Sequence, residues 1–401
     1  MRFSMCTLGC KVNQYDSQKI REGLAAQGHS EARFGEAVDM VVVNTCTVTH
    51  RADADGRRAV RKALRTGAEV VVTGCQAVVY PEALRRAFPS ARVVRPDHVP
   101  TVLGIETPRF VSGLKGHSRA FVVVQTGCDR FCTYCVVPHA RGVPRSRPWQ
   151  EVVGEVAHLV NLGVEEVVLT GVNTGLYEGG LTRLVQKVLR YTSVKRVRLS
   201  SLEPFTVEDC LADLLADEPR VCAHLHLSVQ HASDRILASM GRPLSSRALR
   251  SLVELLSSSV LGLSLGADVI VGFPGETERD FLETYAFFEE LPFSYLHVFP
   301  FSPRPGTRAS SMEGRVDPGV VSMRSRALRS LSQRKRRAFA ASRVGSVEEV
   351  LVTRAEEGGV FGVSSTYLGV FSSTKIEPGG IVPVRITGVQ GHVLTGEPLV
   401  Q

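Results

Sequence analysis

The sequence has no long apolar run. Its apolar stretches are short, such as residues 70–72, and none approaches the roughly 20 residues of a membrane-spanning helix. Residues 1–6 lead directly into a strand pattern and lack the apolar core and cleavage site of a secretory signal. These absences predict a cytoplasmic protein without a transmembrane helix.

A signature of disorder is also missing, because hydrophobic residues make up 43% and charged residues 22% of the chain. Its 401 residues suffice for two or three domains, each with a core. The nine cysteines are not expected to form disulfides in a reducing compartment, so metal binding or redox chemistry better explains any that cluster. The net charge of +8 suggests a polyanionic partner.

Strands alternate with helices in the first part of the chain, which predicts an open parallel sheet with α/β winding. Strands are expected at 2–8, 38–43 and 70–73, and helices at 13–27, 50–65 and 81–88. Cys10, Cys46 and Cys75 each follow one of these strands. Because the loops at the carboxyl ends of parallel strands gather at one edge, we expect the three thiols to converge on a metal site. The alternative is three small buried residues at strand ends.

A second group of three cysteines, Cys128, Cys132 and Cys135, follows the strand-like run at 121–124. Three thiolates cannot complete the four-thiolate set that usually holds an iron–sulfur cluster. An iron–sulfur cube held here would therefore keep one iron open to a small-molecule ligand. The alternative is a zinc site in which His139 supplies a fourth ligand.

Five further strand–helix units follow this motif. Strands are expected at 166–170, 196–200, 224–229, 263–271 and 295–299, and helices at 148–162, 181–191, 206–216, 247–257 and 276–291. An eight-unit barrel would need more chain, so six units predict a partial, open (β/α)6 barrel.

The end of the chain has a different composition. Short β-rich runs at 349–353, 360–364, 367–371, 381–387 and 392–397 are separated by glycine-rich turns. They predict a small Greek-key barrel of OB type, which is a common nucleic-acid module. A basic helix is expected before it, at 323–344, and a solvated linker helix is the plain alternative. The helix at 50–65 is also basic and is either a solvated surface or one that steers RNA.

The motif at 128–135 resembles the signature of radical S-adenosylmethionine enzymes. The motifs at 7–15, 44–49 and 73–75 are similar to those of one branch, the radical S-adenosylmethionine methylthiotransferases, and the resemblance covers the whole chain. It implies a methylthiotransferase amino-terminal domain with an auxiliary iron–sulfur cluster at 1–117, a radical domain at 118–337 and a TRAM RNA-binding domain at 338–401. The motifs at 171–175 and 299–307 are most similar to the MtaB-type subfamily, which methylthiolates threonylcarbamoyladenosine next to the tRNA anticodon.

The resemblance implies two 4Fe-4S clusters and S-adenosylmethionine as cofactors, and the six cysteines as ligands and catalytic residues. One S-adenosylmethionine would methylate a sulfur held at the cluster of Cys10, Cys46 and Cys75. A second would be cleaved to a 5′-deoxyadenosyl radical at the cluster of Cys128, Cys132 and Cys135, so that C2 of the adenine receives the methylthio group. The expected contacts to S-adenosylmethionine are Gly171, Ser201, Glu203, Ser228, Gln230, Asp268 and Val298.

The basic segment 141–147 follows the cluster motif and is a candidate clamp for carboxylate or phosphate groups, or else an exposed loop. Three positions depart from the family pattern: Val78, the pair at 231–232 and Leu176. They leave substrates such as isopentenyladenosine in tRNA or an aspartate of a ribosomal protein open. A non-catalytic zinc protein that binds RNA is an alternative of another class. An electron donor and a sulfur source are implied as further partners.

Overall fold

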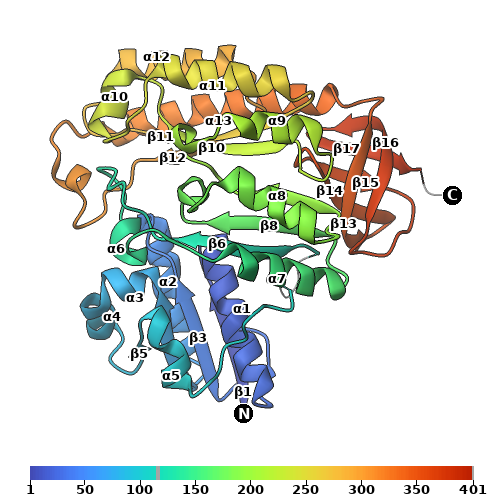
Figure 1. Ribbon diagram of the computed structural model, residues 1–401. Helices are drawn as coiled ribbons and strands as arrows, with labels where there is room; N and C mark the ends of the chain where they lie inside the picture. Colours follow the sequence, from blue (N-terminus) through green and yellow to red (C-terminus); the bar gives the residue numbers. More distant parts are fainter. Residues whose placement is uncertain (114–117, 400–401) are drawn as a thin grey trace.

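The computed structural model describes residues 1–113 and 118–399, which form three successive regions (Figure 1). An α/β region at the amino terminus lies below a central open barrel, and a small β-barrel lies beside this central barrel. Within the described residues, no helix is both long and apolar enough to cross a membrane.

The first region is a five-stranded parallel sheet in the order β2-β1-β3-β4-β5, as predicted. Its strands are β1 Arg2–Thr7, β2 Ser30–Glu31, β3 Met40–Thr45, β4 Glu69–Gly74 and β5 Arg92–Val93. Its helices are α1 Lys11–Ala26, α2 His50–Leu64, α3 Cys75–Val79, α4 Pro81–Ala87 and α5 Val99–Leu103, with a 3-10 turn at Pro96–His98. Every residue of β3 is buried, which explains the unbroken apolar run of this central strand.

Six parallel strands form the central region, as the sequence predicts. They are β6 Ala120–Thr126, β8 Glu166–Gly171, β9 Arg196–Leu199, β10 His224–Gln230, β11 Ser264–Val271 and β12 Tyr295–Pro300. The sheet of β6, β8 and β9 meets the sheet of β10, β11 and β12 through isolated bridges at Val197–Val221 and Leu202–Leu227. A short antiparallel strand, β7 Arg145–Ser146, pairs with β6 at the edge. The six strands therefore make an open barrel.

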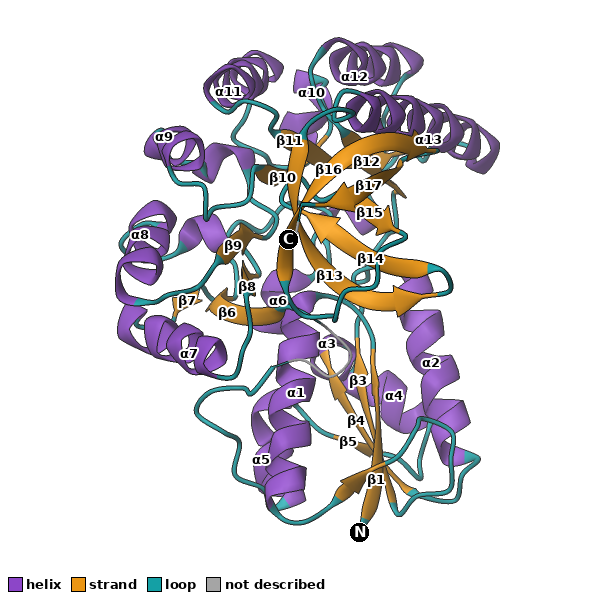
Figure 2. Cartoon of the chain, turned by 90° about the vertical axis from the view of Figure 1, so that its right-hand side faces the viewer, coloured by secondary structure: helices purple, strands orange, loops and turns teal. Residues whose placement is uncertain are grey.

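Helices cover the outside of this barrel as an arc around the strands (Figure 2). They are α7 Trp149–Asn161, α8 Leu181–Tyr191, α9 Cys210–Asp217, α10 Asp234–Ser239, α11 Ser246–Ser259, α12 Glu278–Glu290 and α13 Pro318–Ala341, while α6 Val137–Arg141 follows the cysteine motif. Short 3-10 turns occur at Thr174–Leu176, Pro204–Thr206 and Arg308–Ser311. The helix expected from residue 206 begins at Cys210, because the chain first forms the turn at Pro204–Thr206.

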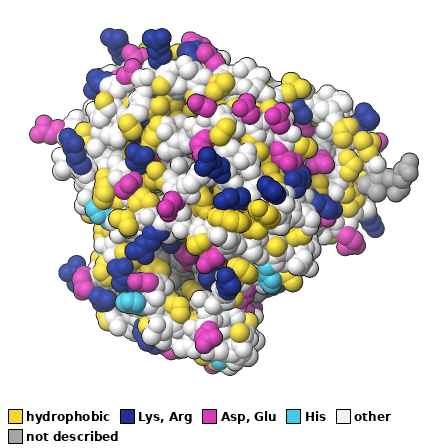
Figure 3. All heavy atoms as spheres, viewed as in Figure 1, with side chains coloured by type: hydrophobic (Ala, Val, Ile, Leu, Met, Phe, Trp, Pro, Cys, Tyr) yellow, Lys and Arg dark blue, Asp and Glu magenta, His cyan; other side chains and the backbone are white. Residues whose placement is uncertain are grey.

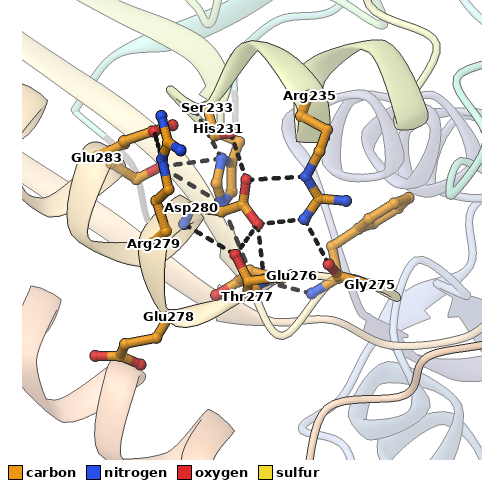
Figure 4. A network of polar contacts seen from close by, with 12 residues as sticks. His231, Ser233, Arg235, Gly275, Glu276, Thr277, Glu278, Arg279, Asp280 and Glu283 are labelled. Atoms are coloured by element: carbon orange, nitrogen blue, oxygen red, sulfur yellow. Dashed lines mark hydrogen bonds and ion pairs between the residues drawn. The ribbon is translucent and has the colours of Figure 1, made fainter.

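A polar network fixes the start of α12 (Figure 4). Thr277 and Asp280 form a reciprocal capping box, in which each side chain accepts a hydrogen bond from the other's backbone N–H. His231 accepts a hydrogen bond of 3.0 Å from the N–H of Ser233. Burial lowers the pKa of His231 to about 3, so the ring is neutral at pH 7. His231, which departs from the family pattern, therefore belongs to the polar network that holds the start of α12.

The third region is a closed barrel in the order β13-β14-β15-β17-β16, which confirms the predicted small barrel. Its strands are β13 Val347–Glu356, β14 Gly359–Ser364, β15 Gly369–Ser372, β16 Ile381–Gln390 and β17 Val393–Pro398. Tyr367 was expected to begin a strand, but it lies in the preceding turn. Its φ of 66° is left-handed and incompatible with a strand.

Helix α13 joins the two barrels. Leu328 and Leu331 belong to the central core, whereas Ala340 belongs to the core of the small barrel. The predicted basic helix is therefore packed, and part of its charge is used inside the fold. Arg324, for example, is 4% exposed and pairs with Glu276 at 2.8 Å.

Candidate active site

The first three cysteines lie where the loops of the amino-terminal sheet meet. Cys10 caps α1, Cys46 follows β3 and Cys75 begins α3. The backbone at Gly9 has a φ of +97°, and a Cβ there would lie 2.7 Å from the Cβ and 2.9 Å from the Sγ of Cys46. A Cβ at Gly74 would come within 2.3 Å of a backbone oxygen of β3. Both glycines are therefore required for the close approach of these loops.

A cavity of about 660 Å³ is lined by all three of these cysteines. Cys46 and Cys75 are buried, while Cys10 is exposed. Burial raises the pKa of Cys46 to about 11, so its thiol is protonated at neutral pH unless a metal binds.

The second three cysteines lie in a loop between β6 and α6 that is held by backbone contacts. The N–H of Cys128 donates to the carbonyl of Gly142 at 2.9 Å, and that of Thr133 donates to the carbonyl of Met240 at 2.9 Å. Burial raises the pKa of Cys135 to about 12. This thiol, too, needs a bound cation to ionise.

The positions of the thiols bear on whether either group is set to hold a single zinc ion. Ligand atoms lie about 2.0–2.3 Å from zinc and therefore within about 4 Å of one another. In the described parts of the chain, just one group of three or more His, Cys, Asp and Glu ligand atoms lies within 4.8 Å, namely that of His226, Asp268 and His297. Neither cysteine group meets this limit. Neither group is therefore held in the geometry of a single zinc ion within the described residues.

Two smaller cavities adjoin the first and share lining residues with it. One, of about 270 Å³, touches Cys10 as well as the predicted contacts Gly171, Ser201, Glu203 and Ser228. The other, of about 200 Å³, touches Cys135 and the predicted contacts Gln230 and Asp268. The structure thus gathers six of the seven predicted cofactor contacts around the two cysteine groups. Val298 is buried in the core and lines none of these three cavities.

Two of the gathered residues already have protein partners. Glu203 forms an ion pair with the buried Arg242. Oδ1 of Asp268 lies 2.9 Å from Nε2 of His226 and 3.4 Å from Nδ1 of His297. Burial raises the pKa of Asp268, but the contacts with both histidines outweigh burial and lower it overall. Sequence reasoning missed these histidines, although their positions on β10 and β12, the strands on either side of β11 with Asp268, were a usable signal.

The basic segment 141–147 differs from the predicted clamp. Arg141 pairs with Asp16 at 2.8 Å, and Arg147 pairs with Glu155 at 2.5 Å. Both arginines bind carboxylates of the protein itself. Arg141 thereby joins the first region to the central one, and Arg147 does so through a hydrogen bond of 3.2 Å to the hydroxyl of Tyr15. Figure 3 shows a hollow between these two regions, with Lys and Arg side chains at its rim.

Comparisons with known proteins identify relatives of this chain. The chain matches the Radical SAM superfamily over residues 122–288 and the Uncharacterized protein family UPF0004 over residues 2–95. It is 34% identical to the threonylcarbamoyladenosine tRNA methylthiotransferase MtaB of Bacillus subtilis (strain 168), over 95% of this chain and 92% of the relative. It is 32% identical to the tRNA-2-methylthio-N(6)-dimethylallyladenosine synthase of Bartonella tribocorum, over 98% of this chain and 95% of the relative.

Among solved structures, the radical S-adenosylmethionine methyltransferase TsrM from Kitasatospora setae, with cobalamin and a [4Fe-4S] cluster bound, shares the fold. The TM-score is 0.57 at 17% identity, and the match covers 77% of this chain and 76% of that one. The identities over nearly the full length, together with the matched radical domain, decide the family. The chain belongs to the radical S-adenosylmethionine methylthiotransferases.

Proposed function

We propose that this protein adds a methylthio group to C2 of N6-threonylcarbamoyladenosine next to the anticodon of tRNA. One observation carries the proposal: the cavity lined by Cys10, Cys46 and Cys75 adjoins one lined by Cys135 of the second group, in a chain 34% identical to an enzyme named for that nucleoside. The proposed ligands of the radical cluster are Cys128, Cys132 and Cys135. Those of the auxiliary cluster are Cys10, Cys46 and Cys75.

The target explains why such cofactors are needed. The C–H bond at C2 of adenine is neither acidic nor nucleophilic, so acid–base groups of a protein have no means of activating it. A 4Fe-4S cluster with S-adenosylmethionine supplies a carbon radical when bound, while the protein supplies binding and orientation.

In this chain, the orienting groups come from the carboxyl ends of the barrel strands. We propose that Gly171, Ser201 and Ser228 bind S-adenosylmethionine in the cavity beside Cys10. We propose that Glu203, Gln230 and Asp268 also contact S-adenosylmethionine. Val298 would act through its main chain, because its side chain is buried.

We further propose that tRNA is bound by its anticodon stem–loop and that the small barrel at 338–401 contributes to this binding, since small β-barrels are common nucleic-acid modules. The proposed domains are 1–117, 118–337 and 338–401, so the second boundary falls within α13. An electron donor and a sulfur source remain to be identified. A cytoplasmic location is proposed because tRNA and reducing conditions occur there.

Paired cysteine variants test the division of labour. Cys46→Ala should abolish methylthiolation yet spare 5′-deoxyadenosine formation, whereas Cys132→Ala should abolish both. Cys210→Ala is the matched control, because Cys210 is exposed and lines none of the three cavities. Loss of deoxyadenosine in Cys46→Ala with an intact radical cluster would contradict the assignment. If the anaerobically purified wild-type protein contained stoichiometric zinc and no acid-labile sulfide, this result would contradict the proposed radical methylthiotransferase activity.

A second candidate substrate is the dimethylallyl-modified adenosine of tRNA, because a relative at 32% identity is named for it. Mass spectrometry of tRNA nucleosides from a deletion strain separates the two. Loss of the methylthio group from threonylcarbamoyladenosine alone supports the first candidate, and loss from the dimethylallyl nucleoside supports the second.

A further inference from the structure

A buried group of charges lies between the open barrel and the small barrel. Glu166, which is fully buried, pairs with Arg196 at 2.5 Å, with Arg198 at 3.0 Å and with Arg119 at 3.5 Å. Three guanidinium groups therefore surround one carboxylate. Burying such an excess of positive charge is costly unless other groups compensate it.

Two of these arginines are fully used within the protein. Arg196 donates to the carbonyls of Glu349 and Val363 at 2.8 and 3.0 Å, in addition to Glu166. Arg198 donates to the carbonyls of Ser364 and Ser365, both at 2.9 Å. These bonds fasten β13 and the end of β14 to the central region, so Arg196 and Arg198 are structural.

Arg119 is different. Its Nη1 is buried and has no hydrogen-bond partner in the described part of the chain. Its guanidinium lies 5.5 Å from the centre of the Tyr367 ring. Arg119 and Tyr367 both line the 660 Å³ cavity that also touches Cys10, Cys46 and Cys75. Arg119, whose Nη1 lies 3.5 Å from Glu166 but makes no hydrogen bond within the described residues, thus lines the same space as the proposed sulfur site.

Lys11 adds a second positive charge to this cavity. It is half-buried, and within residues 1–113 and 118–399 no carboxylate forms an ion pair with it. Burial raises the pKa of Tyr367, but the charges of Arg119 and Lys11 outweigh burial and lower it overall. The wall formed by Lys11, Arg119 and Tyr367, which we call the cationic wall, is therefore suited to an anion.

The position of the cationic wall identifies that anion. The adenine must reach the cavity of the first cysteine group if sulfur is transferred there, and its N6 substituent enters the same cavity. The threonylcarbamoyl group ends in a carboxylate, whereas the dimethylallyl group is neutral. Resting on the proposed function, we propose that Arg119, Lys11 and Tyr367 bind the carboxylate of the threonylcarbamoyl group and so select this nucleoside over the dimethylallyl one.

Binding measurements with synthetic anticodon stem–loops test this assignment without depending on catalysis. Three fluorescent RNAs of one sequence would carry threonylcarbamoyladenosine, dimethylallyladenosine or plain adenosine. The wild type should bind the first most tightly. Arg119→Gln and Lys11→Gln should each weaken binding of the first RNA by about tenfold or more, since a hydrogen bond to a charged group is lost, and leave the other two unchanged. Arg279→Gln is the matched control, because its side chain is 88% exposed on α12.

Equal weakening toward all three RNAs would overturn the proposal, since the cations would then bind backbone phosphate. Unchanged binding of the threonylcarbamoyl RNA in both variants would overturn it as well. Lys11→Gln leaves the Glu166 group intact and decides the matter if Arg119→Gln does not fold. Methylthiolation of threonylcarbamoyladenosine by the wild type is a separate measurement. Its failure overturns the proposed function, whereas unchanged selectivity in the variants overturns only the carboxylate assignment.

Discussion

The hydroxyl of Tyr15 in α1 donates a hydrogen bond of 2.8 Å to the buried carboxylate of Glu155 in α7. The same carboxylate accepts from Arg147 at 2.5 Å and from the N–H of Val111 at 3.0 Å. The two cysteine groups lie in the two regions that these bonds join. A polar anchor remote from the chemistry therefore helps to set the distance between the groups.

Tyr15→Phe should lower the free energy of unfolding by about 1–2 kcal/mol, because the hydrogen bonds to Glu155 and from Arg147 are lost while Glu155 keeps its arginine. Glu155→Ala should cost about 3 kcal/mol or more, since it leaves Arg147 without its main partner. Urea denaturation followed by the fluorescence of Trp149, the only tryptophan, measures both changes. Tyr191→Phe is the control, because Tyr191 is 54% exposed. Equal midpoints for all variants would contradict the anchor.

The free energy of unfolding should also depend on pH, because the carboxyl group of Glu166 titrates. Burial raises the pKa of this carboxyl, but the guanidiniums of Arg198 and Arg196 outweigh burial and lower it to about 2. A carboxyl whose folded pKa is depressed contributes stability above its unfolded pKa of about 4.3, and this stability is lost as the pH falls toward about 2.

The contribution is on the order of 3 kcal/mol at neutral pH. Glu166→Gln should therefore be less stable than the wild type at pH 7, and the difference should shrink between about pH 4.3 and 2. Urea midpoints at a series of pH values provide the measurement. A difference that does not change with pH would mean that the carboxylate charge is not what stabilises the fold.

Much of the fold could be predicted because local pattern and tertiary role agree. The strand Met40–Thr45 is buried throughout and is correspondingly apolar in sequence. The two-residue strands Ser30–Glu31 and Arg92–Val93 carry no pattern, because so short an edge strand is defined by its neighbour. Tyr367 was misassigned since its residue type favours strands while its backbone is held in a turn.

The convergence of Cys10, Cys46 and Cys75 on one cavity was predictable, because each follows a parallel strand of the same sheet. The cationic wall could not be predicted from the sequence, because it depends on how the small barrel packs against the other two regions. Lys11 and Tyr367 belong to the first and third regions and line one cavity only after the central barrel brings both regions together. The partners of Arg141 and Arg147 were missed for the same reason, since Asp16 and Glu155 lie on other elements.

Arg198→Met should loosen the small barrel from the central region. The change removes the hydrogen bonds to the carbonyls of Ser364 and Ser365 and one partner of Glu166, while keeping the length of the side chain. Limited proteolysis should then release a fragment that begins near the end of α13 faster than in the wild type. Arg326→Met, on α13, is a control for the loss of an arginine from the protein. Equal cleavage rates in both variants and the wild type would contradict a fastening role for Arg198.

Gly9→Ala should impair the first cysteine group without removing a thiol. An added Cβ would lie 2.7 Å from the Cβ of Cys46, and the φ of +97° disfavours any side chain. Iron and sulfide content after anaerobic reconstitution should fall to about half, because the proposed cluster of Cys128, Cys132 and Cys135 is untouched. Deoxyadenosine formation should persist while methylthiolation is lost. Gly28→Ala is the matched control, since its φ of +78° is similar but a Cβ there meets nothing within 4 Å. Full iron content in Gly9→Ala would show that the close approach to Cys46 is not needed to build the cluster.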